Sequence, residues 1–93
     1  MYSHIVMFKL EEEEDIPSTV SMLSGMDAHI PQIRFLEVGV DDSPSERSAN
    51  IVLITRFDSR EAMEVYQKHP HHRQVVAYLK QINAQSLKVN YAD

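Results

Sequence analysis

The residues best suited to chemistry gather in one short segment, YQKHPHH, at residues 66–72. Histidine titrates near neutral pH and is therefore a natural general acid or base. Helical spacing places His72 on the same face as Val76, and this apolar face is the one that would turn toward a sheet. We therefore predict that Tyr66 and His72 point into the space between helix and sheet.

The other histidines of this region have plain structural explanations. A histidine on an apolar helix face is most often a core residue with a hydrogen bond. His69 directly precedes Pro70 and suits a helix cap whose ring bonds the local backbone. We expect His71 and His29 at the surface.

One further histidine, His4, interrupts an otherwise apolar strand face near the N-terminus. A buried polar side chain needs a partner. A pocket shared with Tyr66 or His72 would supply one, and so would a backbone group near the strand end. The candidate catalytic residues are thus His72 and Tyr66, and the candidate substrate-binding residues are His4, Tyr66 and His72.

The sequence offers little for other kinds of chemistry. It has no cysteine, which excludes thiol nucleophiles, disulfides and zinc–thiolate sites. The histidines lack the spacing of a zinc-binding HExxH motif, and two glycines cannot build a phosphate-binding loop. The acidic runs at residues 11–15 and 41–42 are read as solvated loops rather than cation sites. We expect no metal and no cofactor.

Length and composition describe a small globular domain. The 93 residues are expected to form one domain over residues 1–93, and 43% of them are hydrophobic. A net charge of −5 argues against a nucleic-acid partner. No apolar run approaches the roughly 20 residues of a membrane span, and no signal-peptide pattern is present. We therefore expect a cytoplasmic protein without a membrane partner.

The hydrophobic pattern predicts the element order β-α-β-β-α-β. Strands are expected at residues 2–10, 33–40, 51–57 and 84–91. The first helix should include Pro17 in its first turn and end before Pro31. The second should open at Asp58-Ser-Arg-Glu61 as a capping box, break at Pro70 and resume over residues 71–82. This order is typical of a ferredoxin-like α+β sandwich, a four-stranded antiparallel sheet with both helices on one face.

The strands at residues 2–10 and 51–57 are apolar on both faces. Two helices can cover only one face of a four-stranded sheet, and an exposed apolar face of this size is an aggregation hazard or an interface. We therefore predict a homodimer in which the second faces pack sheet against sheet about a two-fold axis.

Five segments of the chain resemble the stress-responsive dimeric α/β-barrel (Dabb) domain family. They are HIVMFKL at residues 4–10, LEVG at 36–39, FDS at 57–59, YxxHPxH at 66–72 and VxY at 89–91. The resemblance covers essentially the whole chain. It implies a ferredoxin-like protomer and a homodimer whose two sheets form a barrel-like core. Most bacterial members of the family have no assigned reaction.

A plant polyketide cyclase that forms olivetolic acid belongs to this family, and the resemblance to it implies a reaction for the candidate residues. By position it implies that His72 takes a proton alpha to a carbonyl, that Tyr66 helps to hold the substrate and that His4 lines the pocket. Ile51 stands where the cyclase has a further pocket histidine. The pocket expected here therefore has one polar group fewer.

Three functions remain open from the sequence. The first is a homodimer of unassigned biochemical role with a small apolar pocket for a hydrophobic or aromatic ligand. The second is a polyketide-cyclase-like or lyase-like enzyme that uses His72 as general base with Tyr66. The third is a non-enzymatic, stress-associated protein whose surface contacts a protein partner.

Overall fold

Four strands form one antiparallel sheet in the computed structural model, which describes all 93 residues. The sheet order is β2-β3-β1-β4, so the first strand of the chain lies in the middle of the sheet. Both neighbours of β1 run antiparallel to it. The strands are β1 (Tyr2–Lys9), β2 (Phe35–Val40), β3 (Ile51–Phe57) and β4 (Gln85–Ala92).

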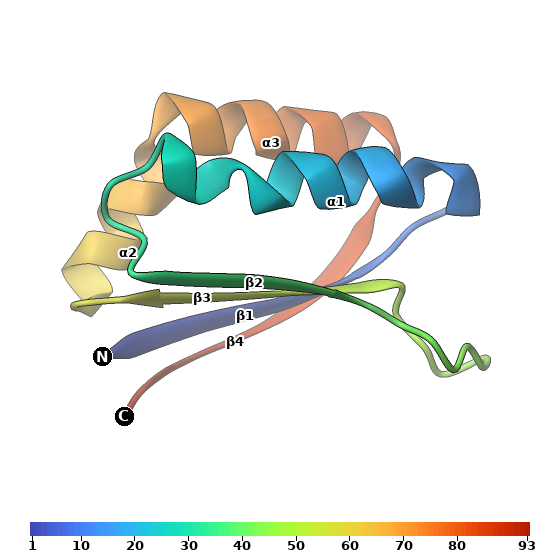
Figure 1. Cartoon of the computed structure of the whole chain (residues 1–93), viewed down its shortest axis with the longest axis horizontal. Helices are drawn as coiled ribbons and strands as arrows, with labels where there is room; N and C mark the ends of the chain where they lie inside the picture. The colour runs from blue at the N-terminus through green and yellow to red at the C-terminus, as the bar shows by residue number, and fades with distance from the viewer.

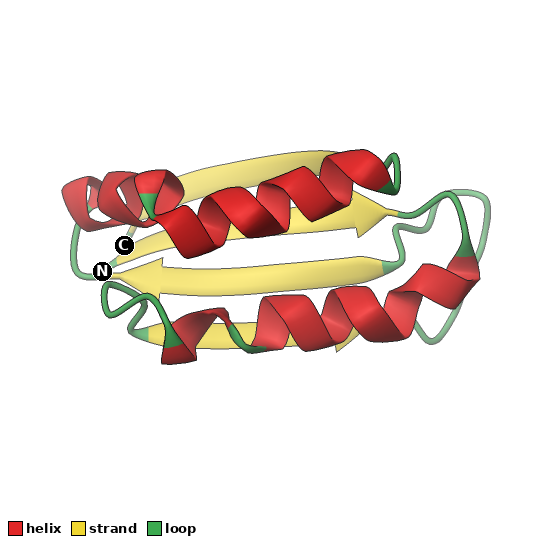
Figure 2. Cartoon of the chain, turned by 90° about the horizontal axis from the view of Figure 1, so that it is seen from above, coloured by secondary structure: helices red, strands yellow, loops and turns green.

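All helices lie on one face of this sheet (Figures 1 and 2). They are α1 (Ile16–Ser24), α2 (Arg60–Lys68) and α3 (Pro70–Gln81), with short 3-10 turns η1 (Glu13–Asp15) and η2 (Met26–Ala28) at the two ends of α1. This arrangement confirms the predicted ferredoxin-like α+β sandwich. No helix is long and apolar enough to cross a bilayer.

The core lies between the helices and the inner face of the sheet. Alternation along β1 and β3 sends every second side chain inward, and the pairing register sets Val6 beside Leu53 and Phe8 beside Ile51. These side chains pack with others from α1, η2 and α2. The fully or almost fully buried members are Leu23, Met26, Ile30, Ile51, Leu53, Phe57 and Tyr66.

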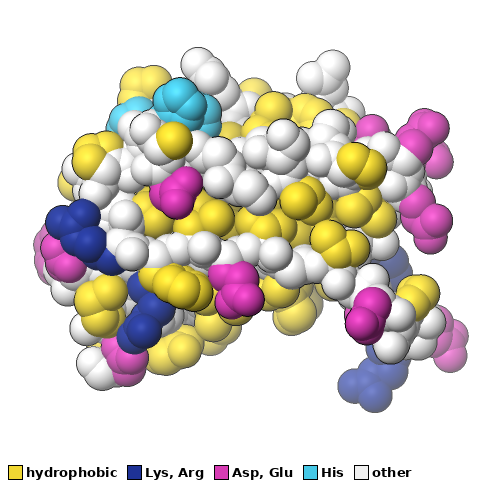
Figure 3. All heavy atoms as spheres, viewed as in Figure 1, with side chains coloured by type: hydrophobic (Ala, Val, Ile, Leu, Met, Phe, Trp, Pro, Cys, Tyr) yellow, Lys and Arg dark blue, Asp and Glu magenta, His cyan; other side chains and the backbone are white.

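The outer face of the sheet is apolar and open to solvent in the single chain. Ile5 and Met7 of β1 lie beside Val89 and Leu87 of β4 in the pairing register. Yellow hydrophobic spheres are visible along the underside of the molecule (Figure 3). The exposed large side chains on this face, with their exposed fractions, are Phe35 46%, Met7 46%, Tyr91 47%, Val89 54% and Leu87 74%.

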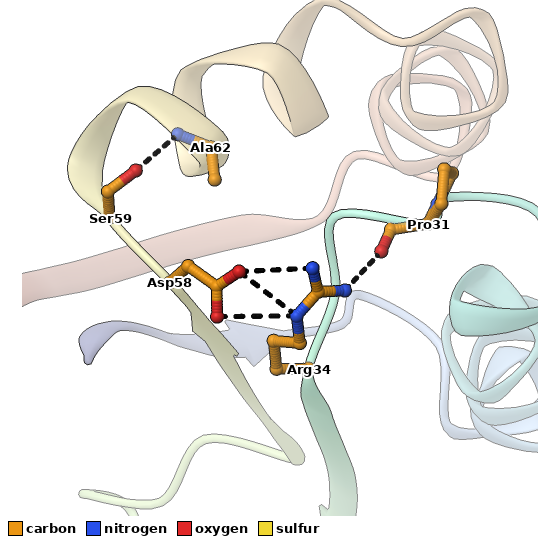
Figure 4. Close-up of polar contacts among 5 residues, drawn as sticks. All are labelled: Pro31, Arg34, Asp58, Ser59 and Ala62. Atoms are coloured by element: carbon orange, nitrogen blue, oxygen red, sulfur yellow. Dashed lines mark hydrogen bonds and ion pairs between the residues drawn. The ribbon is translucent and has the colours of Figure 1, made fainter.

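The corner between β3 and α2 differs from the predicted capping box (Figure 4). The N-cap is Ser59, whose hydroxyl accepts a 3.1 Å hydrogen bond from the Ala62 backbone N–H. Asp58, the expected cap, instead forms a 3.0 Å ion pair with Arg34. The prediction was wrong by one residue because Asp58 is occupied by a cation from the segment before β2.

Two other predicted boundaries differ from the structure by more than one residue, whereas those of β1, β4 and α3 differ by one. The first helix ends at Ser24 and the chain continues through η2 toward Pro31, so the predicted helical segment contains a break at Gly25. β2 begins at Phe35 rather than residue 33, because the Ile33 backbone N–H donates to the Ile30 carbonyl in a turn. Ile33 is buried nonetheless, which explains its strand-like apolar signal.

Candidate functional site

A cavity of about 540 Å³ lies between α3 and the inner face of β1 and β4. Sixteen residues line it, ten of them hydrophobic. The size and apolar lining are typical of a small-molecule site. Ala84 and Ser86 are small side chains on its β4 side, so they leave room beneath the helix. His4, Tyr66 and His72 all line this cavity.

Tyr66 forms part of the floor of the cavity. Helix α2 presents it to the core, where it is 1% exposed and its ring packs on Phe57 at a centroid distance of 4.9 Å. Its hydroxyl donates to the sulfur of Met26 at 3.9 Å, which is a weak acceptor. Burial raises the pKa of Tyr66 well above its ordinary value of 10.0. The phenol is therefore a neutral hydrogen-bond donor at working pH.

His72 is placed by the break between α2 and α3. Pro70 occupies the first turn of α3, and His72 follows two residues later. The Nδ1 atom lies 3.0 Å from the Gln67 carbonyl oxygen at the end of α2. Because a carbonyl can only accept, Nδ1 carries the proton and Nε2 keeps a free lone pair. Burial lowers the pKa of His72, and the Gln67 bond opposes this shift.

His4 has a matching arrangement on the sheet. It faces Asn90 across the β1–β4 pair, with Nδ1 2.5 Å from the amide oxygen Oδ1. With that oxygen as acceptor, Nδ1 again carries the proton and Nε2 is free. Burial lowers the pKa of His4, the Asn90 bond partly offsets this, and the nearby Lys88 lowers it further.

Tyr66 has an imidazole ring near it from both His4 and His72. Its ring centroid is 4.5 Å from that of His72 and 6.1 Å from that of His4, with interplanar angles of 56° and 64°. A mostly apolar cavity thus has two imidazole acceptors and one phenol donor in its wall. Such a set can orient the polar group of an apolar ligand and accept a proton from it.

Asn90 is a site residue that sequence reasoning missed. The alternation of Ser86, Lys88 and Asn90 along the last strand was visible as a polar face. Finding the partner of His4 required the β1–β4 register, which the sequence does not state. The same register places Lys88 opposite Val6 on the cavity side of the sheet.

The remaining histidines have roles apart from the cavity wall. His69 caps α3, because its Nδ1 accepts a 3.0 Å hydrogen bond from the His71 backbone N–H, as expected. His29 is exposed as expected, whereas His71 is half-buried because their rings stack at 4.3 Å. The cyan histidine spheres gather at this end of the helical layer (Figure 3). No group of three His, Cys, Asp or Glu side chains in the chain has a geometry that could hold a metal ion.

Several solved structures are similar to this chain in fold. A dimeric ferredoxin-like protein of unknown function from Bacteroides fragilis is 28% identical, with a TM-score of 0.86 over 99% of this chain and 95% of that one. A dimeric ferredoxin-like protein of unknown function from Thermobifida fusca is 22% identical, with a TM-score of 0.85 over 99% and 90%. A hydroxynitrile lyase from Passiflora edulis is 13% identical, with a TM-score of 0.83 over 97% and 90%.

The similarity to the last two structures shows the fold alone, because one fold hosts many unrelated functions. No curated protein matches the chain. The family model for the stress responsive A/B barrel domain matches residues 3–93, which is nearly the entire sequence and includes every residue of the cavity wall. The chain therefore belongs to the stress-responsive A/B barrel (Dabb) domain family.

Proposed function

We propose that the cavity binds a small hydrophobic or aromatic molecule and that His72 removes a proton from it as a general base. The observation that carries this proposal is the hydrogen bond between His72 Nδ1 and the Gln67 carbonyl. That bond fixes the ring and leaves Nε2 as the basic atom. A nucleophile or base held by a third group in this way is a recurring feature of catalytic sites.

The proposed step is abstraction of a proton alpha to a carbonyl. The C–H bond breaks, its proton goes to Nε2 of His72, and the electron pair moves into the enolate with its charge on oxygen. The Tyr66 hydroxyl donates to that oxygen, exchanging its weak Met26 partner for a strong acceptor. His4 offers a second acceptor for a hydroxyl or N–H of the ligand. Aldol additions and aldol-type cyclisations begin with such a step.

Proton exchange on a simple ketone tests the base directly. Acetophenone is incubated with the protein in D2O, and loss of the methyl proton signal is followed by NMR. We expect the native protein to exceed His72→Gln by roughly a hundredfold, the contribution of one general base. The control is His71→Gln, since His71 does not line the cavity. Equal exchange in the native protein and His72→Gln, with only a lower melting temperature, would make His72 structural.

Ligand binding distinguishes this proposal from a non-enzymatic interaction protein. A molecule that binds the folded state raises the melting temperature in proportion to the logarithm of its concentration. We expect acetophenone to do so for the native protein and to lose the effect with Val76→Trp, which fills the cavity from α3. A flat melting temperature for both proteins would favour the interaction role instead.

The proposed active form is a homodimer built through the outer sheet faces. Two features support it: the exposed apolar side chains of β4 and β1, and the dimeric state given for the similar Bacteroides fragilis protein. The helices lie on the opposite face of the sheet (Figure 1). The cavity is lined by residues of α3 and the inner side of β1 and β4, so the two cavities stay accessible in such a dimer. The cytoplasmic location stays a prediction from the sequence.

A further inference from the structure

Every formally charged side chain in the cavity wall is a cation. Lys80 reaches it from the last turn of α3 and Lys88 from the middle of β4. No aspartate or glutamate lines the cavity. A shallow hollow on the adjoining side of α3 shares His72 and Lys80 and adds Arg73, again with no acidic residue.

This concentration of cations runs against the charge of the whole chain. The protein has fourteen acidic and nine basic residues, so a random surface region would be acidic. The ion pairs of the chain join Met1 and Arg56 to Asp93 and Arg34 to Asp58. Lys80 and Lys88 take part in none of them, which leaves both ammonium groups available to an anion from outside the chain.

Lys88 is close to the polar end of the site. It sits two residues before Asn90 on the same side of β4, and Asn90 holds His4. Its charge contributes to the lowered pKa of His4, after burial. The lysine stem can cover apolar wall while its ammonium stays at the opening, as long cationic side chains commonly do.

An inward-pointing lysine on an edge strand also protects a sheet from edge-to-edge aggregation. β4 is such an edge strand, so this explanation applies to Lys88. It does not apply to Lys80, which approaches the same cavity from a helix. Nor does it explain why no carboxylate accompanies either lysine.

We infer that the ligand is an amphipathic acid, with an apolar or aromatic body in the cavity and a carboxylate at the opening between Lys80 and Lys88. This inference rests on the proposed ligand-binding function of the cavity. His4 and His72 bind as neutral imidazoles near pH 7, so the lysines supply the positive charge. The carboxylate would anchor the molecule and leave its body beside Tyr66 and His72.

Matched pairs of acid and amide test the charge preference. Binding of benzoate, naphthoate and octanoate is measured by titration calorimetry beside the primary amide of each. We expect the acids to bind about threefold to tenfold more tightly than the amides, the size of one or two partly exposed ion pairs. Added salt should weaken the acids and leave the amides unchanged.

Two single variants test whether Lys88 causes the preference for acids over amides. Lys88→Gln should reduce the acid preference about threefold. Lys68→Gln has the same change in net charge, but Lys68 is exposed in the last turn of α2 and does not line the cavity, so this variant should leave the preference unchanged. Equal binding of acid and amide by the native protein would overturn the inference and leave the cavity as a neutral ligand site. An unchanged preference in both Lys88→Gln and Lys80→Gln would also overturn it. Binding of neither acid nor amide would overturn the proposed function itself.

Discussion

At the scale of single residues, the site depends on which imidazole nitrogen carries the proton. His72 donates Nδ1–H to a backbone carbonyl, and His4 donates Nδ1–H to the amide oxygen of Asn90. Both rings therefore keep Nε2 as the acceptor. Burial lowers both pKa values, which keeps the rings in the neutral form that can act as a base.

This lowering predicts how stability changes with pH. The unfolded chain binds protons at His4 and His72 near the ordinary pKa of 6.5, whereas the folded chain binds them only at lower pH. Between those values the unfolded state holds more protons, so the free energy of unfolding falls as pH falls through 6.5 toward the folded pKa values.

Melting temperatures measured across this pH range show whether acidification lowers or raises the stability of the protein. The native protein should lose stability on acidification below pH 6.5, and the His4→Gln/His72→Gln variant should lose less over the same range. A native melting temperature that rises on acidification would mean that the folded pKa values are raised instead.

Two substitutions at Tyr66 distinguish the contribution of its hydroxyl from that of its ring. Tyr66→Phe removes only a weak bond to Met26, so the free energy of unfolding should change by less than about 1 kcal/mol. Tyr66→Ala empties a core position and should cost about 3–5 kcal/mol. Denaturant unfolding measures both.

The same Tyr66→Phe protein should exchange ketone protons roughly tenfold more slowly or worse, because the enolate oxygen loses its donor. If Tyr66→Phe is as unstable as Tyr66→Ala, the hydroxyl is a structural group and its proposed role in the step is wrong.

At the scale of elements, the site depends on the junctions at the two ends of α2. Ser59 caps its first turn, and the Arg34–Asp58 pair ties the preceding corner to the segment before β2 (Figure 4). At the other end, Pro70 and the His69 cap turn the chain into α3. These junctions place Tyr66 and His72 against one another although they belong to different helices.

Substitutions at Ser59 test how much the helix cap contributes to stability. Ser59→Ala should lower the free energy of unfolding by about 1 kcal/mol, because the Ala62 N–H loses its acceptor, and Ser59→Asp should restore most of it. Chemical unfolding of the two variants, with Ser43→Ala in the exposed loop as control, checks this. Equal stability of Ser59→Ala and native protein would show that solvent replaces the cap at no cost.

The sequence predicted which elements exist more accurately than where they begin. Strand alternation and helical spacing depend on local periodicity, so the order of elements could be read from the chain. The cap at Ser59 could not, because Asp58 and Ser59 are both good caps, and the ion pair of Asp58 with Arg34 is a tertiary contact that the local sequence does not show. In the same way, Asn90 could not be predicted as the partner of His4, because their pairing depends on the register of β1 and β4.

At the scale of the whole molecule, the sheet has two apolar faces and the chain covers only one (Figures 1 and 3). The sequence predicted this imbalance from the two-sided strands. An apolar pocket between the helices and the sheet is also expected from the sequence, and the small side chains of Ala84 and Ser86 leave room for it beneath α3. Its full lining depends on the strand register, which brings Lys88 to the cavity side of the sheet.

The proposed dimer gives a matched pair of variants. Val89→Glu places a charge on the outer sheet face, where Val89 is 54% exposed, and should convert a dimer to monomer. Val65→Glu places the same charge on α2, where Val65 is 50% exposed, and should leave the dimer intact. Light scattering after size-exclusion chromatography measures both masses. A native protein that elutes as a monomer at micromolar concentration would contradict the dimer.

NMR of the imidazole rings tests whether His72 offers an unprotonated Nε2 to a ligand in the cavity. Long-range nitrogen–proton correlations assign the tautomer of His72, and a titration with acetophenone follows its ring signals. We expect a proton on Nδ1, a pKa below 6.5 and ring signals that shift on binding. A proton on Nε2, or ring signals that do not move while the ligand binds, would contradict it.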